Sequence, residues 1–192
     1  ATAYRKSKAV SFLIFCYRLA PPVGNNFVST KQKKMQTDTN TKGIRIKGGK
    51  LLYTSIVINA TPVKVWKELT TFANYPQWNP FIRSVSGTPA PGHSIQVTLQ
   101  PPNGKPILMK PMVLVFEPQK ELRWIGSLGI PYIFDGEHVF RLEENTDGST
   151  TLHHFERFRG ILVPFLSTLL NKTTRDGFSL MNAALKQRAE KQ

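Results

Sequence analysis

The sequence predicts an α+β domain in which a curved antiparallel sheet of seven strands wraps around one long C-terminal helix. Three observations lead to this prediction. After residue 50, β-rich runs alternate with short connections rich in Gly, Pro, Asn or Asp, and short connections require antiparallel pairing. Two short helical patterns follow the first of these runs. Near the C terminus, Val163–Gln187 repeats apolar residues every three or four positions, which is the period of one helix face.

Local signals set the order of the elements. Lys50–Ile58 is rich in residues that favour extended structure and forms the first predicted strand. A helix then begins at Thr61, its N-cap, with Pro62 at the first helical position. Pro76 and Pro80 interrupt the segment that follows, which predicts a short second helix and a turn. The remaining strands are predicted over Phe81–Ser86, Ser94–Leu99, Ile107–Phe116, Glu121–Gly126, Tyr132–Glu144 and Ser149–Phe158.

The positive charge is concentrated near the N terminus. The chain has 192 residues and a formal net charge of +14, and residues 1–50 hold 11 Lys/Arg and one acidic residue. Residues 51–192 hold 15 Lys/Arg and 11 Asp/Glu, so the predicted folded part is only mildly basic. This part shows no zinc-ligand spacing and no stripe of basic and aromatic residues, which argues against nucleic-acid binding. A basic tail attracts anionic surfaces, so one expectation is a weak contact of residues 1–49 with anionic membrane.

Residues 1–49 are predicted to be a disordered leader and linker, and residues 50–192 to be the folded domain. Gln36–Gly49 is polar and rich in Gly and Thr, as linkers are. The apolar run Ala9–Tyr17 is too short to span a bilayer. Its basic, acid-poor surroundings fit a mitochondrial transit segment or, more weakly, a signal peptide. A disordered leader of a cytoplasmic protein is the other reading.

No cofactor and no metal ion are expected. The only cysteine is Cys16, so a disulfide within the chain cannot form. The four histidines show no metal-ligand spacing, and His153 and His154 are strand neighbours that point to opposite faces. The sequence also lacks a nucleotide-binding loop and a nucleophile elbow.

The C-terminal helical pattern is apolar at both ends and small in the middle. Thr173 and Gly177 occupy that middle, where a purely structural helix would usually carry Leu or Ile because voids in a core are costly. The sequence therefore predicts a space between this helix and the sheet, and ligand sites tend to occur in such spaces. Two alternatives stay open: a bulky sheet residue fills the gap, or Gly177 permits close approach. The recurring apolar positions are Leu166, Leu169, Leu170, Met181, Ala184 and Leu185.

Strand parity places a polar pair on the inner face of the last two strands. In Tyr132–Glu144 and Ser149–Phe158 the even-numbered positions should face the helix. With Asn145–Ser149 as the hairpin loop, Glu156 lies opposite His138 and either orients it as a general base or joins it in binding a ligand hydroxyl or carbonyl. The alternative is a mutually satisfied buried pair that sets the strand register. The predicted opposing pairs are Leu142–Leu152, Phe140–His154 and His138–Glu156.

Five stretches of the sequence carry a resemblance to a known family. They are NATPVKVWKELTTFANYPQWNPFIRSVSG (Asn59–Gly87), LRWIG (Leu122–Gly126), FDGEHVFRLE (Phe134–Glu143), HHFERFRG (His153–Gly160) and GFSLMNAALKQRAE (Gly177–Glu190). Over about residues 50–190 the chain resembles the SRPBCC superfamily, also called START-like or helix-grip proteins, and within it the polyketide cyclase/dehydrase-like group. The resemblance implies a helix-grip fold with a deep apolar cavity between the sheet and the last helix. It implies no particular catalytic residue, since the superfamily has no universal catalytic signature.

The residues and the resemblance together predict a monomeric domain that binds a hydrophobic or aromatic small molecule, lipid-like or polyketide-like. The alternative is a cofactor-free polyketide cyclase or dehydratase in which the His138–Glu156 pair transfers protons. A third role, as a co-chaperone or lipid carrier, would use the basic tail on an anionic membrane or a protein partner. The candidate ligand-binding residues are Trp124, Phe134, His138, Phe140, His154, Glu156, Phe158, Leu166, Leu170, Thr173, Gly177 and Met181.

Overall fold

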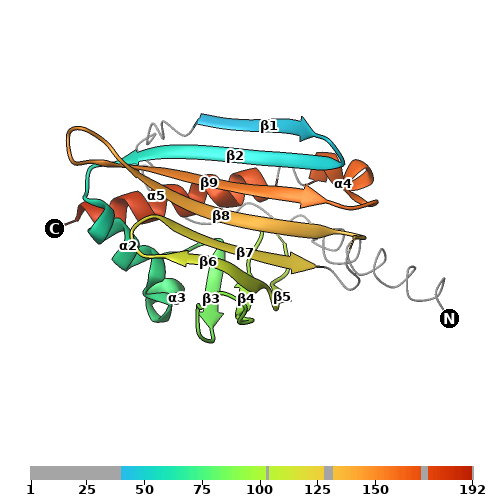
Figure 1. The fold of residues 1–192 in the computed structure, drawn as a ribbon, viewed down its shortest axis with the longest axis horizontal. Coiled ribbons are helices and arrows are strands. Elements are labelled where there is room, and N and C mark those ends of the chain that lie inside the picture. Colours follow the sequence, from blue (N-terminus) through green and yellow to red (C-terminus); the bar gives the residue numbers. More distant parts are fainter. Residues whose placement is uncertain (1–39, 103, 128–131, 170–172, 192) are drawn as a thin grey trace, which may run out of the picture.

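A computed structural model describes residues 40–102, 104–127, 132–169 and 173–191 of the chain (Figure 1). Its elements are β1 (Asn40–Ile46), β2 (Gly49–Ile58), α2 (Pro62–Thr70), the 3-10 turn η1 (Phe72–Asn74), α3 (Tyr75–Trp78), β3 (Ile82–Ser86), β4 (Gln96–Leu99), β5 (Ile107–Met109), β6 (Met112–Glu117), β7 (Glu121–Ser127), β8 (Asp135–Glu144), β9 (Thr150–Arg159), α4 (Val163–Leu169) and α5 (Arg175–Glu190). Figure 1 shows α5 crossing one face of the large sheet, with α4 at one end of that sheet and α2 at the other.

The described strands form two antiparallel sheets. The larger sheet has the strand order β1-β2-β9-β8-β7-β6, and the smaller has the order β3-β4-β5. A bridge between Ser94 and Met112 joins them. The α+β architecture with a C-terminal helix is confirmed, but the prediction of seven strands in one sheet is wrong. The predicted strand Ile107–Phe116 is divided around Lys110 and Pro111, because proline has no N–H for a sheet hydrogen bond.

The edge strand β1 consists of residues that the sequence assigned to a linker. All seven residues of β1 pair with β2, from Asn40–Ser55 to Ile46–Gly49. The turn between the two strands has a φ of +73° at Gly48, a conformation that glycine adopts without strain. The glycines of this segment therefore serve a tight hairpin, and the linker prediction is wrong from residue 40 onward. The leader, residues 1–39, lies outside the described residues.

The β8–β9 hairpin has the predicted register. A hydrogen bond of 2.8 Å from Asn145 N to Ser149 O closes its loop, and this loop length fixes which residues lie opposite one another. The even-numbered positions face α5, as predicted, and most of them are buried. The confirmed pairs are Leu142–Leu152, Phe140–His154 and His138–Glu156.

Ion pairs cover part of the opposite, outer face of the large sheet. Arg123 binds Glu121 and also lies 3.3 Å from Glu137, which in turn lies 3.2 Å from Arg157. The Arg157 guanidinium lies 5.1 Å from the centroid of the Phe155 ring. These long side chains cover apolar residues. This explains why Phe155 is buried on a face that strand parity assigned to solvent.

The predicted space beneath Gly177 is filled by an aromatic ring. A Cβ placed on Gly177 would lie 2.3 Å from Cδ2 of Phe81, the residue that leads into β3. The Phe81 ring packs edge to face on Phe178 of α5, with their centroids 5.7 Å apart. The prediction of a gap at Gly177 is therefore wrong. Both alternatives fit the structure, because the bulky Phe81 fills the position and Gly177 permits its close approach. The predicted helix Val163–Gln187 contains α4 and α5, and Leu170 between them lies outside the described residues.

Candidate functional site

Five polar side chains gather on the inner face of the large sheet. β2 contributes Thr54, β8 contributes His138, β9 contributes His154 and Glu156, and α5 contributes Asn182. The Glu156 side chain is 16% exposed, and the other four residues are buried. The strand residues all have the inward-facing parity, so their polar groups meet beneath α5.

Hydrogen bonds connect four of these side chains and define where their protons lie. The Thr54 hydroxyl donates to the His154 carbonyl oxygen at 2.8 Å, so its oxygen accepts from Asn182 Nδ2 at 2.9 Å. Asn182 Oδ1 is therefore the acceptor that faces His154 Nδ1 at 2.7 Å, which places a proton on that nitrogen. His154 Nε2 then accepts from His138 Nε2 at 2.8 Å. It follows that His138 carries its proton on Nε2 and presents Nδ1 as an acceptor.

Burial keeps the titratable members of this group uncharged. It lowers the pKa of His138 to about 3 and raises the pKa of Glu156 to about 8. Burial also lowers the pKa of His154 well below 6.5, and His138 lowers it further, while the hydrogen bond with Asn182 opposes the shift. At neutral pH both imidazoles are neutral and Glu156 is mostly a carboxylic acid.

The His138–Glu156 pair is close but is not joined by a hydrogen bond. His138 Nδ1 and Glu156 Oε2 are 3.7 Å apart, which exceeds hydrogen-bond length. The hydrogen-bond partner of His138 is His154, so the two members of the predicted pair do not satisfy each other. Gly136 provides the room for the carboxyl, because a Cβ there would lie 2.5 Å from Glu156 Oε1.

Aromatic rings enclose the two imidazoles. Trp124 stacks on His138 with ring centroids 5.1 Å apart, and Phe178 stacks on His154 at 3.8 Å. Phe140 lies beside both imidazoles, at 4.7 and 4.4 Å. The three aromatic rings belong to the buried core. Trp124 and Phe140 are thus packed in the interior, and their contact with a ligand stays a prediction.

The other predicted ligand residues come from the strands β8 and β9 and from the helical segments. Phe134 and Phe158 pack on each other with ring centroids 5.6 Å apart, near the ends of β8 and β9. Met181 is fully buried on α5, and Leu166 on α4 packs against the core while partly exposed. Thr173 lies just before α5. Phe134, Phe158 and Met181 thus belong to the hydrophobic core, and their contact with a ligand, like that of Leu166 and Thr173, stays a prediction.

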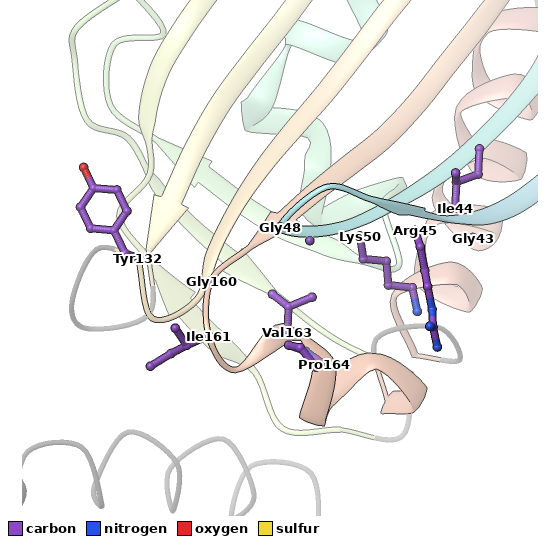
Figure 2. Close-up of a pocket in the computed structure, with 11 residues that line it drawn as sticks. Gly43, Ile44, Arg45, Gly48, Lys50, Tyr132, Gly160, Ile161, Val163 and Pro164 are labelled. Atoms are coloured by element: carbon purple, nitrogen blue, oxygen red, sulfur yellow. The ribbon is translucent and has the colours of Figure 1, made fainter.

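A pocket of about 740 Å³ opens at one end of the large sheet (Figure 2). The β1–β2 turn, the residue Tyr132 and the segment that leads from β9 into α4 form its walls. None of the predicted ligand residues is among its described lining residues. The alternation of isoleucine and cations from Ile44 to Lys47 is a strand pattern that points to this hairpin. The lining residues are Gly43, Ile44, Arg45, Gly48, Gly49, Lys50, Tyr132, Gly160, Ile161, Val163 and Pro164.

The pocket has a positive side. Arg45 and Lys50 are directly opposite one another in the β1–β2 pairing, and their side chains extend in the same direction (Figure 2). Lys50 is buried, and this burial lowers the pKa of its amine, which the charge of Arg45 lowers further. The described lining residues include these two cations and no carboxylate. The electrostatic field on this side of the pocket therefore favours a polar or anionic group.

Backbone hydrogen bonds fix the position of the pocket wall formed by the segment between β9 and α4. Gly160 has a φ of +125°, and a Cβ on it would lie 2.4 Å from the carbonyl oxygen of Ile133. Ile161 N donates to Tyr132 O at 3.3 Å, and Leu162 N donates to Ile133 O at 3.1 Å. Because only glycine permits this approach, Gly160 allows the chain after β9 to lie against the start of β8 and close one side of the pocket.

The described part of the chain was compared with the requirements of a metal site and of a membrane-spanning helix. In it, no group of three or more His, Cys, Asp or Glu side chains has an arrangement that could hold a metal ion. No helix among the described residues is long and apolar enough to cross a membrane.

Comparison with known proteins gives one family and several similar folds. A family model described as "Polyketide cyclase / dehydrase and lipid transport" matches residues 51–190. No curated protein matches the sequence. The solved structures include the di-domain ARO/CYC BexL from the BE-7585A biosynthetic pathway, with 14% identity, a TM-score of 0.58, and coverage of 74% of this chain and 50% of that chain. The di-domain ARO/CYC StfQ from the steffimycin biosynthetic pathway has 9% identity, a TM-score of 0.59, and coverage of 73% and 50%.

A START superfamily protein from Mycobacterium smegmatis has 16% identity and a TM-score of 0.59, with 73% of this chain and 97% of that chain covered. This chain thus spans about half the length of each di-domain protein and nearly the whole length of the mycobacterial one. At these identities the likeness concerns the fold.

Proposed function

We propose that this chain, which belongs to the polyketide cyclase/dehydrase and lipid transport family, binds a hydrophobic small molecule in the pocket at the end of its large sheet. The resemblance to START-like proteins that the sequence carries is confirmed by that family and by the folds of its structural neighbours. The observation that supports the proposal best is the pocket itself. Its volume of about 740 Å³ lies within the range of small-molecule sites.

The lining of the pocket matches an amphipathic molecule. Ile161 and Val163 offer apolar surface, and their contact with a ligand would remove that surface from water. Arg45 and Lys50 lie together on one side and would meet a carbonyl, a hydroxyl or an anionic group. The ligand would thus lie between the β1–β2 hairpin and the start of α4. The interior near Gly177 is occupied by Phe81, which favours the end of the sheet over its middle.

Ile161→Asp should weaken ligand binding without unfolding the protein. Ile161 is 63% exposed, so the change costs little stability, but it places a carboxylate on an apolar wall that a ligand must desolvate. With aminoanthracene, a fluorescent apolar probe, the dissociation constant should rise about tenfold or more, since tenfold corresponds to only about 1.4 kcal/mol.

A matched control is Leu108→Asp on β5. Leu108 is 64% exposed, almost the same as Ile161, but is not among the residues that line the pocket. Its variant should bind the probe like the unchanged protein. Equal affinity of the Ile161 and Leu108 variants would exclude the pocket as the site of binding.

A second candidate function is dehydration of a β-hydroxy carbonyl compound. The observation that favours it is a carboxylic acid at Glu156 only 3.7 Å from the unprotonated Nδ1 of His138. His138 would take a proton from the carbon between the two functional groups, and the electrons of that C–H bond would form the new double bond. Glu156 would give its proton to the departing hydroxyl, which leaves as water. A proton passed from His138 to Glu156 would then restore both groups.

Glu156→Gln should abolish that reaction, because an amide cannot act as the acid. A simple probe is the aldol of benzaldehyde and acetone, whose dehydration product absorbs in the near ultraviolet. Turnover should fall about a hundredfold or more in Glu156→Gln and stay unchanged in Glu144→Gln, an exposed residue at the end of β8. If the unchanged protein does not exceed the buffer rate, this candidate is rejected and binding alone remains.

A further inference from the structure

We infer that the end of the large sheet that carries the pocket is a docking surface for an anionic lipid bilayer. This end, called the pocket end, comprises the β1–β2 turn, Tyr132, the residues from Arg159 to Val163, and α4. The strand pairing brings these segments together, because Gly49, Arg159 and Asp135 are opposite one another across β2, β9 and β8. The inference rests on the surface of this end and requires no knowledge of the ligand.

Large apolar side chains project from the pocket end. Phe165 on α4 is 84% exposed and Tyr132 is 83% exposed. Ile161 and Ile44 are also exposed, and both lie at the pocket. Exposed large apolar side chains on several segments of one end of the molecule are a feature of interaction sites. Aromatic side chains are also enriched where proteins meet the interface of a bilayer.

The exposure of Tyr132 is fixed by the backbone. Its φ of +69° is unusual for a residue other than glycine. Its N–H donates to Asp135 Oδ2 at 2.8 Å, and its carbonyl accepts from Ile161 N at 3.3 Å. These two bonds hold the chain in a conformation that directs the ring away from the protein (Figure 2). A strained backbone that presents an aromatic ring to solvent suggests a role for that ring outside the fold.

The charges of the pocket end match an anionic surface. Arg45, Lys47 and Arg159 are exposed there, and Lys50 lies just inside the pocket. One described carboxylate, Asp135, is opposite Arg159 in the β8–β9 pairing. The far end of the same two strands has mixed charge. Lys64 lies with Asp147 at one pocket there, and Lys120 is bonded through its carbonyl to Leu142 N, next to Glu143 and Glu144. The exposed cations of the pocket end would orient the molecule with the pocket toward anionic lipid.

A bilayer fits these features better than an acidic protein partner. Cations that flank exposed aromatic and aliphatic side chains suit an interface in which headgroups lie beside acyl chains. The pocket also opens at this end of the sheet, so a docked bilayer would lie next to the pocket. An acidic protein would account for the cations but would leave Phe165 and Tyr132 without a specific reason for their exposure.

Vesicle binding by the full chain tests this inference. The protein should sediment with vesicles of phosphatidylcholine and phosphatidylserine, and much less with phosphatidylcholine alone. Phe165→Ser should weaken the binding about tenfold, since a partly inserted phenyl group contributes on that scale. Lys47→Glu should weaken it at least about fivefold, the effect of one basic residue near an anionic surface. Neither residue lines the pocket, so both variants should bind aminoanthracene normally.

Two control variants separate this surface from a general effect of charge or apolar exposure. Leu108→Ser removes an exposed apolar side chain from the small sheet, and Lys120→Glu reverses a charge in the β6–β7 turn. Both should bind vesicles like the unchanged protein. Equal losses in the pocket-end and control variants would overturn the inference, and so would a failure of the unchanged chain to bind phosphatidylserine vesicles. Either result would leave the pocket end available to an acidic protein partner.

Discussion

Glu156→Gln should remove a loss of stability that the protein shows as the pH rises from 6.5 to 8. Burial raises the pKa of Glu156 to about 8 in the folded chain, whereas the ordinary value is 4.5. The folded state therefore holds a proton that the unfolded state releases between these values. Its contribution to stability is fully present below pH 4.5 and is lost as the pH rises toward 8. The amide of glutamine does not titrate, so the variant should lack this dependence.

The raised pKa of Glu156 sets the size of this loss in the free energy of unfolding. Each pH unit changes the free energy of unfolding by about 1.4 kcal/mol for one proton, so roughly 2 kcal/mol is lost between pH 6.5 and 8. Urea unfolding at a series of pH values measures it. Glu144→Gln is the control, because Glu144 is exposed at the end of β8, and it should leave the slope in place. The same alkaline slope in Glu156→Gln would show that Glu156 is not the group responsible.

Below pH 6.5 the buried histidines make the free energy of unfolding rise with pH, opposite to the effect of Glu156. Burial lowers the pKa of His138 to about 3 and that of His154 well below 6.5. The unfolded chain therefore binds protons below pH 6.5 that the folded chain does not, and stability falls as the pH decreases. Together with the slope from Glu156, this predicts greatest stability near pH 6.5.

Gly177→Ala should destabilise the protein by about 2 kcal/mol, although alanine favours a helix more than glycine does by about 1 kcal/mol. The new Cβ would lie 2.3 Å from Cδ2 and 2.5 Å from Cε2 of Phe81, so the ring must move. Phe81 is buried and is held edge to face by Phe178, which limits that movement. Urea denaturation at one pH measures the loss.

A second substitution tests whether the clash with Phe81 causes this loss of stability. Phe81→Leu removes ring atoms that the new methyl group would meet, so Gly177→Ala should cost much less in the Phe81→Leu background than alone. Ser179→Ala on the same helix serves as a control for helix propensity. A gain in stability from Gly177→Ala, as expected at an open helix position, would contradict the contact with Phe81.

The sequence predicted the structure best where loop length and strand alternation decide the arrangement. The short hairpin loop that ends at Ser149 fixes the register of β8 and β9, so the opposition of His138 and Glu156 could be predicted. Strand parity then identified the inward face. The choice of hydrogen-bond partner could not be predicted, because His138 meets His154 through ring orientations set by packing. Asn182 offered a signal, since a polar residue lies between Met181 and Leu185 on the buried face of α5.

The pocket and β1 were missed for the same reason. The segment that contains Gly43, Gly48 and Gly49 has the composition of a linker, and only its pairing with β2 shows it to be a strand and a tight turn. The sequence also could not show that Phe81 fills the space at Gly177, because Phe81 is distant in sequence and reaches α5 through tertiary packing. Composition describes local preference, whereas an edge strand is stabilised mainly by its neighbour.

The central claim is that a hydrophobic molecule binds at the end of the sheet between the β1–β2 turn and α4. An NMR titration of the full chain with dodecanol tests this claim residue by residue. Binding should saturate, and the largest changes in amide shift should occur at Gly48, Gly160 and Ile161. Saturable binding with its largest shifts elsewhere, or no saturable binding of dodecanol or aminoanthracene, would contradict it.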